Sequence, residues 1–290
     1  MATYWSAYGS IFLAIHANKM LFKDFTWSPE DLVSQEAFIG LAEDNQDTHI
    51  FMHTDSIENN MRTQFRGIIS PPVFPPPQRI WITGMSDYSI NTGNSVRFDG
   101  LYDKWYGINV DRISPKIQII PLGADTHSDM ALFEDKERVL YEVSKKPVEP
   151  SDTLAYMNFN AYTYLAERGL IHMHFKEVQE TWIKMQVNEK IPYREYCESV
   201  RNHKFTFCPR GNGIDTHRFW ESIYLGSIPI VIDYPQMSYF FDRLPIVKAP
   251  SWFQITEEFL EAEYERIHET DYDFDIMKMG FWRNMILSSE

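Results

Sequence analysis

Two arginines flank a glycine-containing turn in the second half of the chain, an arrangement suited to binding an anion. Arg210 and Arg218 bracket Gly211, Asn212 and Gly213 in the string CPRGNGIDTHRFW. Glycine and asparagine tolerate positive φ angles and leave backbone amides open to a close ligand. A guanidinium fork matches the oxygens of a phosphate group. The turn therefore predicts a site for a phosphate or diphosphate.

The elements around this turn are expected to place it at the end of a parallel strand. FTFC (205–208) is short and apolar, and Pro209 ends it because proline has no amide hydrogen for a continuing ladder. HRFWESIYL predicts a helix with Asp215 or Thr216 as its N-cap, and SIPIVID predicts a second buried strand. In such a unit the ligand lies at the carboxyl end of the first strand, where the helix N-terminus attracts anions.

A carboxylate on the same helix extends the predicted site. Glu221 lies three residues after Arg218 and is suited to accept hydrogen bonds from a ribose or sugar diol. Together these residues indicate a nucleotide that carries a sugar. The alternative is a plain helix cap with a solvated arginine and an Arg218–Glu221 pair, since the turn is neither a Walker loop nor a G-x-G-x-x-G fingerprint.

The string PRGNGIDTHRFWE, followed by LGSIPIV, resembles the donor-site signature of exostosin-like glycosyltransferases. IPYREYCESVRNHK before it and LPIVKAPSWFQIT after it resemble that family's preceding helix and following strand, so the resemblance covers the second half of the chain. It implies an α/β protein of the GT-B type, with two Rossmann-like domains facing a central cleft. Among soluble relatives, the chain looks most like the glycosyltransferases of large algal viruses (chloroviruses) that build capsid glycans.

The resemblance also implies a reaction. Such an enzyme moves a sugar from a UDP-sugar, with UDP-xylose as the leading candidate, to a hydroxyl of an oligosaccharide or glycoprotein acceptor. It inverts the anomeric centre and needs neither a metal nor another cofactor. The strand, loop and helix in LAYMNFNAYTYLAERGL then add two residues to the donor site, although Arg168 also suits a surface position near a helix end. The expected donor-binding residues are Asn160, Arg168, Arg210, Gly211, Asn212, Gly213, Asp215, Thr216, His217, Arg218 and Glu221.

An inverting transfer requires a general base for the acceptor hydroxyl. Asp87 is the first candidate, because it follows the predicted strand 80–83 and its GMSDYSI context resembles the family's strand and loop. Asp55 and His53 follow the predicted strand 50–52 and come next. Loops after parallel strands line the ligand crevice. An aspartate after a strand also commonly does no more than cap a turn.

Composition shifts along the chain suggest its organisation. We expect an acceptor-binding domain over residues 1–124, a charged linker over 125–152, a nucleotide-sugar-binding domain over 153–275 and a final helix over 276–290 that returns to the first domain. Ser28 and Pro29 predict the start of a helix that continues through Leu32, Phe38 and Leu41. The proline-dense stretch 70–78 is expected to be a surface connection.

Charge and cysteine content narrow the function further. The net charge of −14 argues against nucleic acid or an anionic membrane as a partner. With 2 cysteines there is no disulfide framework and no metal-ligand spacing. The carboxylates of ETDYDFD are expected to form a solvated face rather than a metal site, because they lack the spacing of a calcium loop.

SIFLAIHA is too short to span a bilayer, so we expect no transmembrane segment and a soluble, cytoplasmic protein. In a viral protein this means the host cytoplasm, and the Golgi lumen applies only if an anchor was trimmed. Two other functions stay open. A nucleotide-sugar epimerase or dehydrogenase would need a G-x-G-x-x-G turn near the N-terminus, which is absent. A non-catalytic glycan- or nucleotide-binding protein of the same fold is the other alternative.

Overall fold

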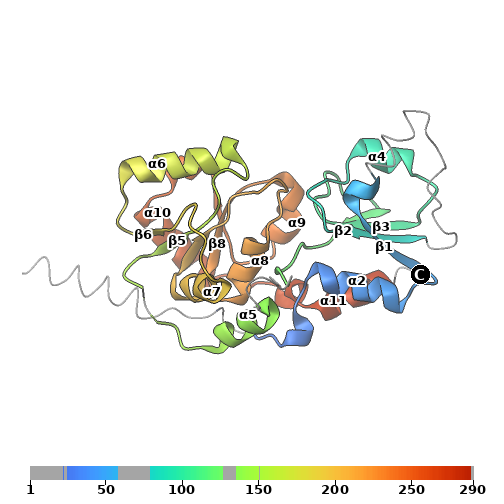
Figure 1. The fold of residues 1–290 in the computed structure, drawn as a ribbon, viewed down its shortest axis with the longest axis horizontal. Coiled ribbons are helices and arrows are strands. Elements are labelled where there is room, and N and C mark those ends of the chain that lie inside the picture. Colours follow the sequence, from blue (N-terminus) through green and yellow to red (C-terminus); the bar gives the residue numbers. More distant parts are fainter. Residues whose placement is uncertain (1–21, 23–24, 58–78, 127–134, 150, 289–290) are drawn as a thin grey trace, which may run out of the picture.

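The chain folds into two parallel β-sheets flanked by helices, as a computed structural model shows (Figure 1). The structure describes residues 22, 25–57, 79–126, 135–149 and 151–288. The predicted strands at 50–52, 80–83, 117–121, 154–157 and 205–208 are present with small shifts at their ends. The prediction of an α/β architecture is therefore confirmed. The segment SIFLAIHA and the proline-dense stretch 70–78 lie outside the described residues.

The first sheet has four parallel strands in the order in which they occur along the chain. They are β1 (His49–His53), β2 (Ile80–Gly84), β3 (Lys104–Gly107) and β4 (Ile117–Ile119). Helices α2 (Gln35–Asp44) and α4 (Thr92–Arg97) belong to the same unit (Figure 1). Three buried tryptophan and tyrosine rings, those of Trp81, Trp105 and Tyr106, fill the centre of this unit.

The second sheet has five parallel strands in the order β6-β5-β7-β8-β9. They are β5 (Ala155–Met157), β6 (Ile183–Met185), β7 (Phe205–Phe207), β8 (Ile228–Ile232) and β9 (Val247–Ala249). The helices of this unit are α6 (Leu170–Val178), α7 (Tyr193–Asn202), α8 (His217–Tyr224), α9 (Ser238–Phe241) and α10 (Glu257–His268). Short helical turns lie at η2 (Leu165–Gly169), η3 (Pro235–Met237), η4 (Trp252–Gln254) and η5 (Phe274–Met277).

The segment that begins at Ser28 forms two helices rather than the single predicted one. Ser28 caps the short helix η1 (Pro29–Asp31), and Asp31 completes a reciprocal capping box with it. A new helix, α2, then begins after Ser34, whose hydroxyl accepts a hydrogen bond from the Ala37 amide at 3.2 Å. A second capping serine six residues after the first therefore divides the helix.

The stretch 125–152, expected as a linker, contains the helix α5 (Lys136–Lys145). Val139, Leu140 and Val143 are buried on one side of α5, which contacts α7 and α8 of the second unit. Because these three apolar residues recur at helical spacing, the sequence of this charged stretch did contain the pattern of a helix with one buried face.

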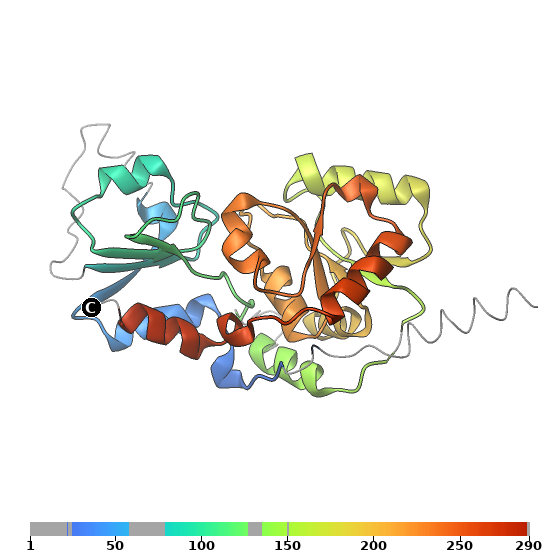
Figure 2. The ribbon, with the colours of Figure 1, turned by 180° about the vertical axis from the view of Figure 1, so that it is seen from behind.

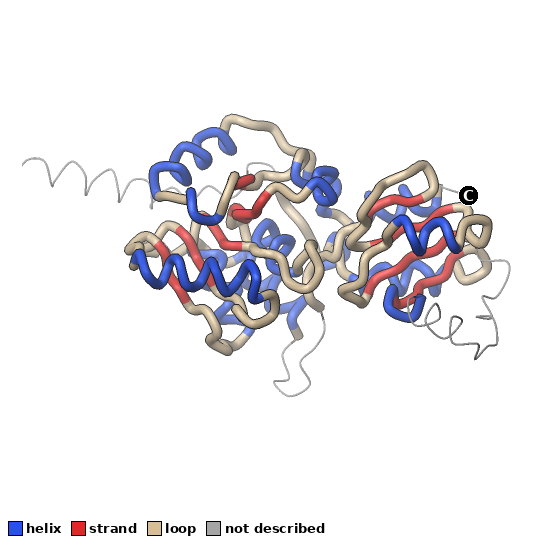
Figure 3. The backbone as a smooth tube through the Cα atoms, turned by 90° about the horizontal axis from the view of Figure 1, so that it is seen from above, coloured by secondary structure: helices blue, strands red, loops and turns tan. Residues whose placement is uncertain are grey.

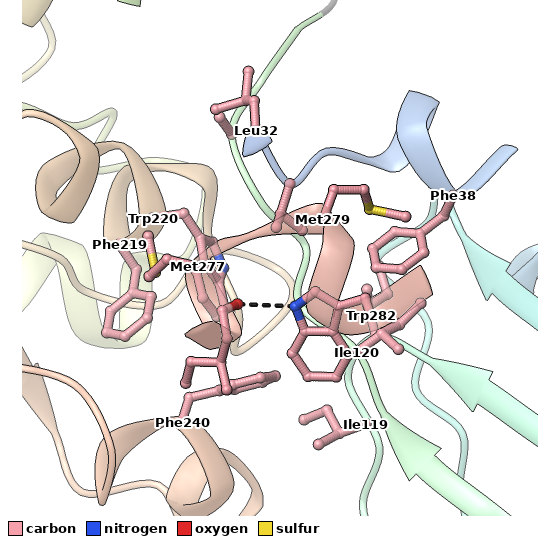
Figure 4. Close-up of a cluster of buried hydrophobic side chains, with 14 of the residues drawn as sticks. Leu32, Phe38, Ile119, Ile120, Phe219, Trp220, Phe240, Met277, Met279 and Trp282 are labelled. Atoms are coloured by element: carbon pink, nitrogen blue, oxygen red, sulfur yellow. Dashed lines mark hydrogen bonds between the residues drawn. The ribbon is translucent and has the colours of Figure 1, made fainter. Parts of the chain in front are cut away.

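The chain ends in α11 (Met279–Leu287), which lies beside α2 next to the first sheet (Figures 1 and 2). Its Trp282 side chain is fully buried, and the indole Nε1 donates to the Ile276 carbonyl at 2.8 Å (Figure 4). Phe38 and Ile120 of the first unit and Phe240 of the second surround this ring (Figure 4). One hydrophobic cluster thus extends through both units. No helix among the described residues is both long and apolar enough to cross a bilayer.

Candidate active site

The order of the strands in the second sheet marks where a ligand fits. From β5 the chain crosses to β6 on one side, and it returns to β7 on the other side of β5. At such a switch point the loops after the two central strands diverge and leave a crevice at their carboxyl ends. The loop after β7 carries Gly211, Asn212 and Gly213, as the sequence predicted. The loop after β5 carries Asn158 and Thr163.

A cavity of about 840 Å³ lies at this place and is also lined by the first unit. Seen from above, the two sheets lie side by side with loops between them (Figure 3). The cavity is large enough for a nucleotide-sized ligand. The second unit contributes Asn158, Thr163, Arg168, Gly211, Asn212, Gly213, Asp215, Thr216, His217, Arg218 and Glu221, and the first contributes Gln35, Glu36, Met85, Ser86, Asp87, Ile108, Asn109 and Leu122.

Arg218 lines the cavity and forms no ion pair with any residue that the structure describes. It lies in the first turn of α8, with its guanidinium carbon 5.6 Å from the centre of the Tyr196 ring. Among the residues that the structure describes, no carboxylate forms an ion pair with Arg218, and its buried Nε has no hydrogen-bond partner. A partly buried charge without a partner is unfavourable, so this guanidinium is suited to bind an anion.

Arg168 holds the two loops of the crevice together. Its guanidinium donates to the carbonyl oxygens of Arg210 at 2.7 Å, Pro209 at 3.2 Å and Asn160 at 3.4 Å. Burial, reinforced by the positive charge of Arg218, lowers the pKa of Arg168 to about 10. Arg168 lines the cavity, so it adds positive charge while it braces the loop. Asn160 does not line the cavity, and its side-chain oxygen accepts from the Tyr162 amide.

Arg210 is turned onto its own loop. Its Nε donates to the Gly211 carbonyl at 3.2 Å and its Nη2 to the Asn212 carbonyl at 2.6 Å. The guanidinium carbon lies 4.4 Å from the centre of the Tyr164 ring. Arg210 is outside the cavity lining, although the sequence placed it with Arg218. Residue spacing does not reveal to which side of a turn a side chain points.

Glu221 is buried and already has hydrogen-bond donors. The Tyr193 and Tyr196 hydroxyls each donate to its carboxylate at 2.9 Å, and the Asp125 amide donates at 3.3 Å. Burial, together with the charge of Glu221, raises the pKa of both tyrosines well above the usual value. The carboxylate is therefore fixed in place by α7, in the lining of the cavity.

Asp215 and His217 connect the donor loop to the first unit. The Asp215 carboxylate accepts from the Leu122 amide at 2.8 Å and from the Trp220 indole at 2.7 Å. Burial raises the pKa of Asp215 to about 6. The His217 ring nitrogen Nδ1 donates to the Gly123 carbonyl at 2.9 Å. Thr216 is the N-cap of α8, but its side chain makes no capping hydrogen bond.

Asp87, the first candidate for the general base, lies in the cavity opposite the donor loop. It follows β2, and its carboxylate accepts a hydrogen bond from the side-chain NH2 group of Asn212 at 3.0 Å. His53 is the last residue of β1, the edge strand of the first sheet, and Asp55 follows that strand. Neither residue lines the cavity. The loops that reach the cavity instead follow β2, β3 and β4.

Several lining residues were not expected from the sequence. Tyr193 and Tyr196 are three residues apart, so their hydroxyls lie on one face of α7, and this spacing was a usable signal. Asn109 follows β3, a strand that was not predicted, so its position gave no signal. Lys136 and Lys190 also line the cavity, and Lys136 is paired with Asp125. Within the described residues, no three His, Cys, Asp or Glu side chains are placed to share a metal ion.

Comparison with known proteins bears on the fold. No protein-family model matches the sequence, and no curated protein matches it. A solved structure described as OtsA in its apo form matches with a TM-score of 0.50 and 10% identity, over 88% of this chain and 78% of that chain. A second structure, described as trehalose-6-phosphate from E. coli bound with UDP-2-fluoro glucose, matches with a TM-score of 0.44 and 9% identity, over 88% of this chain and 73% of that chain.

The OtsA likeness identifies the fold as the GT-B type, an α/β fold, and confirms that prediction. At 10% identity it carries the architecture alone. The resemblance to exostosin-like enzymes continues to rest on the motif around Arg210 and Arg218.

Proposed function

We propose that this chain is a glycosyltransferase that takes a nucleotide-diphosphate sugar, in the first place a UDP-sugar, and transfers the sugar to a hydroxyl of a glycan acceptor. One observation carries the proposal. Arg218, which has no ionic partner within the described part of the chain, lies at the N-terminus of α8 in a cavity between the two units of a GT-B fold. This combination of cation, helix dipole and crevice suits the diphosphate of such a donor.

The donor loop is the part that stabilises the leaving group. The diphosphate lies against the Gly211–Gly213 amides and the first turn of α8, with Arg218 and Arg168 close by. Negative charge develops on the departing diphosphate in the transition state, and fixed donors in a crevice stabilise it without having to reorganise. The proposal needs no metal ion for this step, because the residues themselves supply the positive charge.

Asp87 supplies the base in the proposed inverting reaction. It takes the proton of the acceptor hydroxyl while that oxygen bonds to the anomeric carbon, and the bond between this carbon and the diphosphate oxygen breaks as the nucleoside diphosphate departs. The position of Asp87 supports this role, since its carboxylate contacts Asn212 of the donor loop. The motif resemblance supports inversion and UDP-xylose as the donor.

The test is release of UDP from a panel of UDP-sugars, measured with chelator and with added Mn²⁺. We expect turnover of at least one donor in chelator. Asp87→Asn should lower kcat by about 100-fold or more, because it removes the base, and change UDP affinity by only a few-fold. Asp99→Asn is the matched control, since Asp99 is exposed, is paired with Lys116 and does not line the cavity.

Two results would contradict this proposal. Turnover only with Mn²⁺ would rule out the metal-free form of the reaction. UDP binding without turnover of any donor would favour a nucleotide-binding protein that keeps the fold.

A further inference from the structure

We propose that Asn109 binds the transferred sugar of the donor and thereby determines which sugar is accepted. This inference rests on the proposed function and deepens it. Asn109 belongs to the first unit, lines the cavity and is only 7% exposed. Its position, its backbone conformation and the free end of its side chain all support this role.

Asn109 has a backbone conformation that few residue types adopt. Asn109 lies two residues after β3 and has a φ of 51°. Its carbonyl accepts a hydrogen bond from the Ile90 amide at 3.1 Å. Met85, at the end of the neighbouring strand β2, has a φ of 50° and lines the same cavity. Non-glycine residues with positive φ are uncommon and concentrate at functional sites.

The two ends of the Asn109 side chain have different surroundings. The oxygen Oδ1 accepts from the Asp215 amide of the donor loop at 3.2 Å. Because that amide needs an acceptor, this bond also fixes which end of the side chain is the NH2 group. Among the described residues, no group accepts a hydrogen bond from Nδ2.

The donor loop is shaped to leave room for this NH2 group. A side chain at Gly213 would place its Cβ 2.8 Å from the Asn109 Nδ2. Glycine at this position therefore allows the amide to approach the loop closely. Asn109 thus lies against the loop that is proposed to hold the diphosphate, in the lining of the cavity, and its NH2 group has no acceptor among the described residues.

The neighbours of Asn109 point to the sugar as its ligand. Asn109 and Asp87 follow adjacent strands of the first sheet, and both contact the donor loop. If Asp87 activates the acceptor hydroxyl, the anomeric carbon lies close to Asp87, in the part of the cavity that Asn109 also lines. The cations that suit the diphosphate come from the second unit, whereas Asn109 offers a neutral donor that suits a sugar hydroxyl. A site with such a donor rejects a sugar that leaves it unpaired.

The experiment measures how well two variants discriminate between UDP-sugars. Asn109→Asp keeps an acceptor for the Asp215 amide and removes the NH2 group, and Asn109→Gly removes the whole side chain while tolerating the positive φ. The readout is the ratio of kcat/KM for the preferred UDP-sugar to that for an analogue that differs at one hydroxyl. Both donors carry the same UDP, so the effect of a new charge on the diphosphate cancels in this ratio.

We expect the ratio to fall at least about tenfold in both variants, as loss of one selective hydrogen bond implies. Asn188→Gly is the matched control, because Asn188 also has a positive φ of 64° and also accepts from a backbone amide, but does not line the cavity. It should leave the ratio unchanged.

A ratio that is unchanged in both variants, or that falls only in Asn109→Gly, would overturn the inference and leave Asn109 as a support for the loop. A wild-type protein that turns over no UDP-sugar would overturn the proposed function, and the inference with it. UDP binding to each variant, followed by calorimetry, shows that the site is folded.

Discussion

Two arginines that flank the donor loop have opposite roles in this structure. The Arg210 guanidinium donates its hydrogen bonds to carbonyl oxygens of its own turn. Arg218 instead lies in the cavity without an ionic partner among the described residues. The sequence identified the loop and could not distinguish the two. What separates them is the direction in which each side chain leaves the backbone. An unpaired, partly buried guanidinium is a better indication of an anion site than arginine in a motif.

Asp215 gives a prediction about pH at the same scale. Burial raises its pKa from about 4 to about 6, so the unfolded chain ionises this group at a lower pH than the folded protein does. Its contribution to the free energy of unfolding therefore falls as pH rises from about 4 to about 6, by about 3 kcal/mol at most. The Asp215→Asn variant has no titrating group at this position. Its side-chain amide has one oxygen, so it cannot accept both the hydrogen bond from the Leu122 amide and the one from the Trp220 indole.

Urea unfolding of the wild type and Asp215→Asn at several pH values tests this. The free energy of unfolding of the wild type should exceed that of Asp215→Asn by more at pH 4.5 than at pH 7. An advantage that stays constant, or that grows toward pH 7, would contradict the buried position of this carboxylate.

At the scale of elements, local signals decided what was predictable. The unit β7-loop-α8-β8 was foreseen because its proline, its glycines and its β-branched residues all lie within one stretch of sequence. The strands β3 (Lys104–Gly107) and β6 (Ile183–Met185) were missed, because short strands of mixed composition are defined by their neighbours in the sheet. The donor loop was therefore visible in the sequence, whereas Asn109, which follows β3, was not.

A substitution at Gly123 tests how the elements pack, since this residue lies where the chain leaves the first sheet for the second unit. Its φ is 73°, and an added Cβ would lie 2.1 Å from the Val33 carbonyl oxygen. Gly123→Ala should lower the free energy of unfolding by about 3 kcal/mol or more, because the side chain meets both backbone strain and a clash with backbone. Denaturant unfolding measures this.

Gly40→Ala is the control, because Gly40 lies inside α2 and an added Cβ would meet nothing within 4 Å. That change should stabilise the protein by up to about 1 kcal/mol. Equal effects of the two substitutions would show that the crossing at Gly123 is not packed as described.

At the scale of the molecule, the two units share a core. Phe38 and Ile120 of the first unit belong to the same buried cluster as Trp220 and Phe240 of the second, and Trp282 of α11 lies among them (Figure 4). Asp215, His217 and Asn109 add hydrogen bonds between the units next to the cavity. The relative position of the units, and with it the width of the cavity, therefore depends on contacts far apart in the sequence.

This shared core predicts one cooperative thermal unfolding transition instead of two. Trp282→Ala should lower the free energy of unfolding by about 3–5 kcal/mol, because the cavity it leaves faces both units. Phe253→Ala removes an aromatic ring from a residue that is 52% exposed, so it should lower the free energy of unfolding far less. Scanning calorimetry that resolves two separate transitions in the wild type would contradict the shared core.

The central claim is that the cavity beside α8 binds the diphosphate of a nucleotide donor through Arg218. Isothermal titration of UDP in chelator, into the wild type, Arg218→Ala and Arg283→Ala, tests it most directly. Arg283 is an exposed arginine on α11 outside the cavity lining, so its variant has the same change in net charge. We expect UDP to bind the wild type and Arg283→Ala equally, and Arg218→Ala about 10- to 100-fold more weakly, as loss of a charged hydrogen bond predicts. UDP that fails to bind the wild type, or that binds Arg218→Ala as tightly as the wild type, would contradict the account.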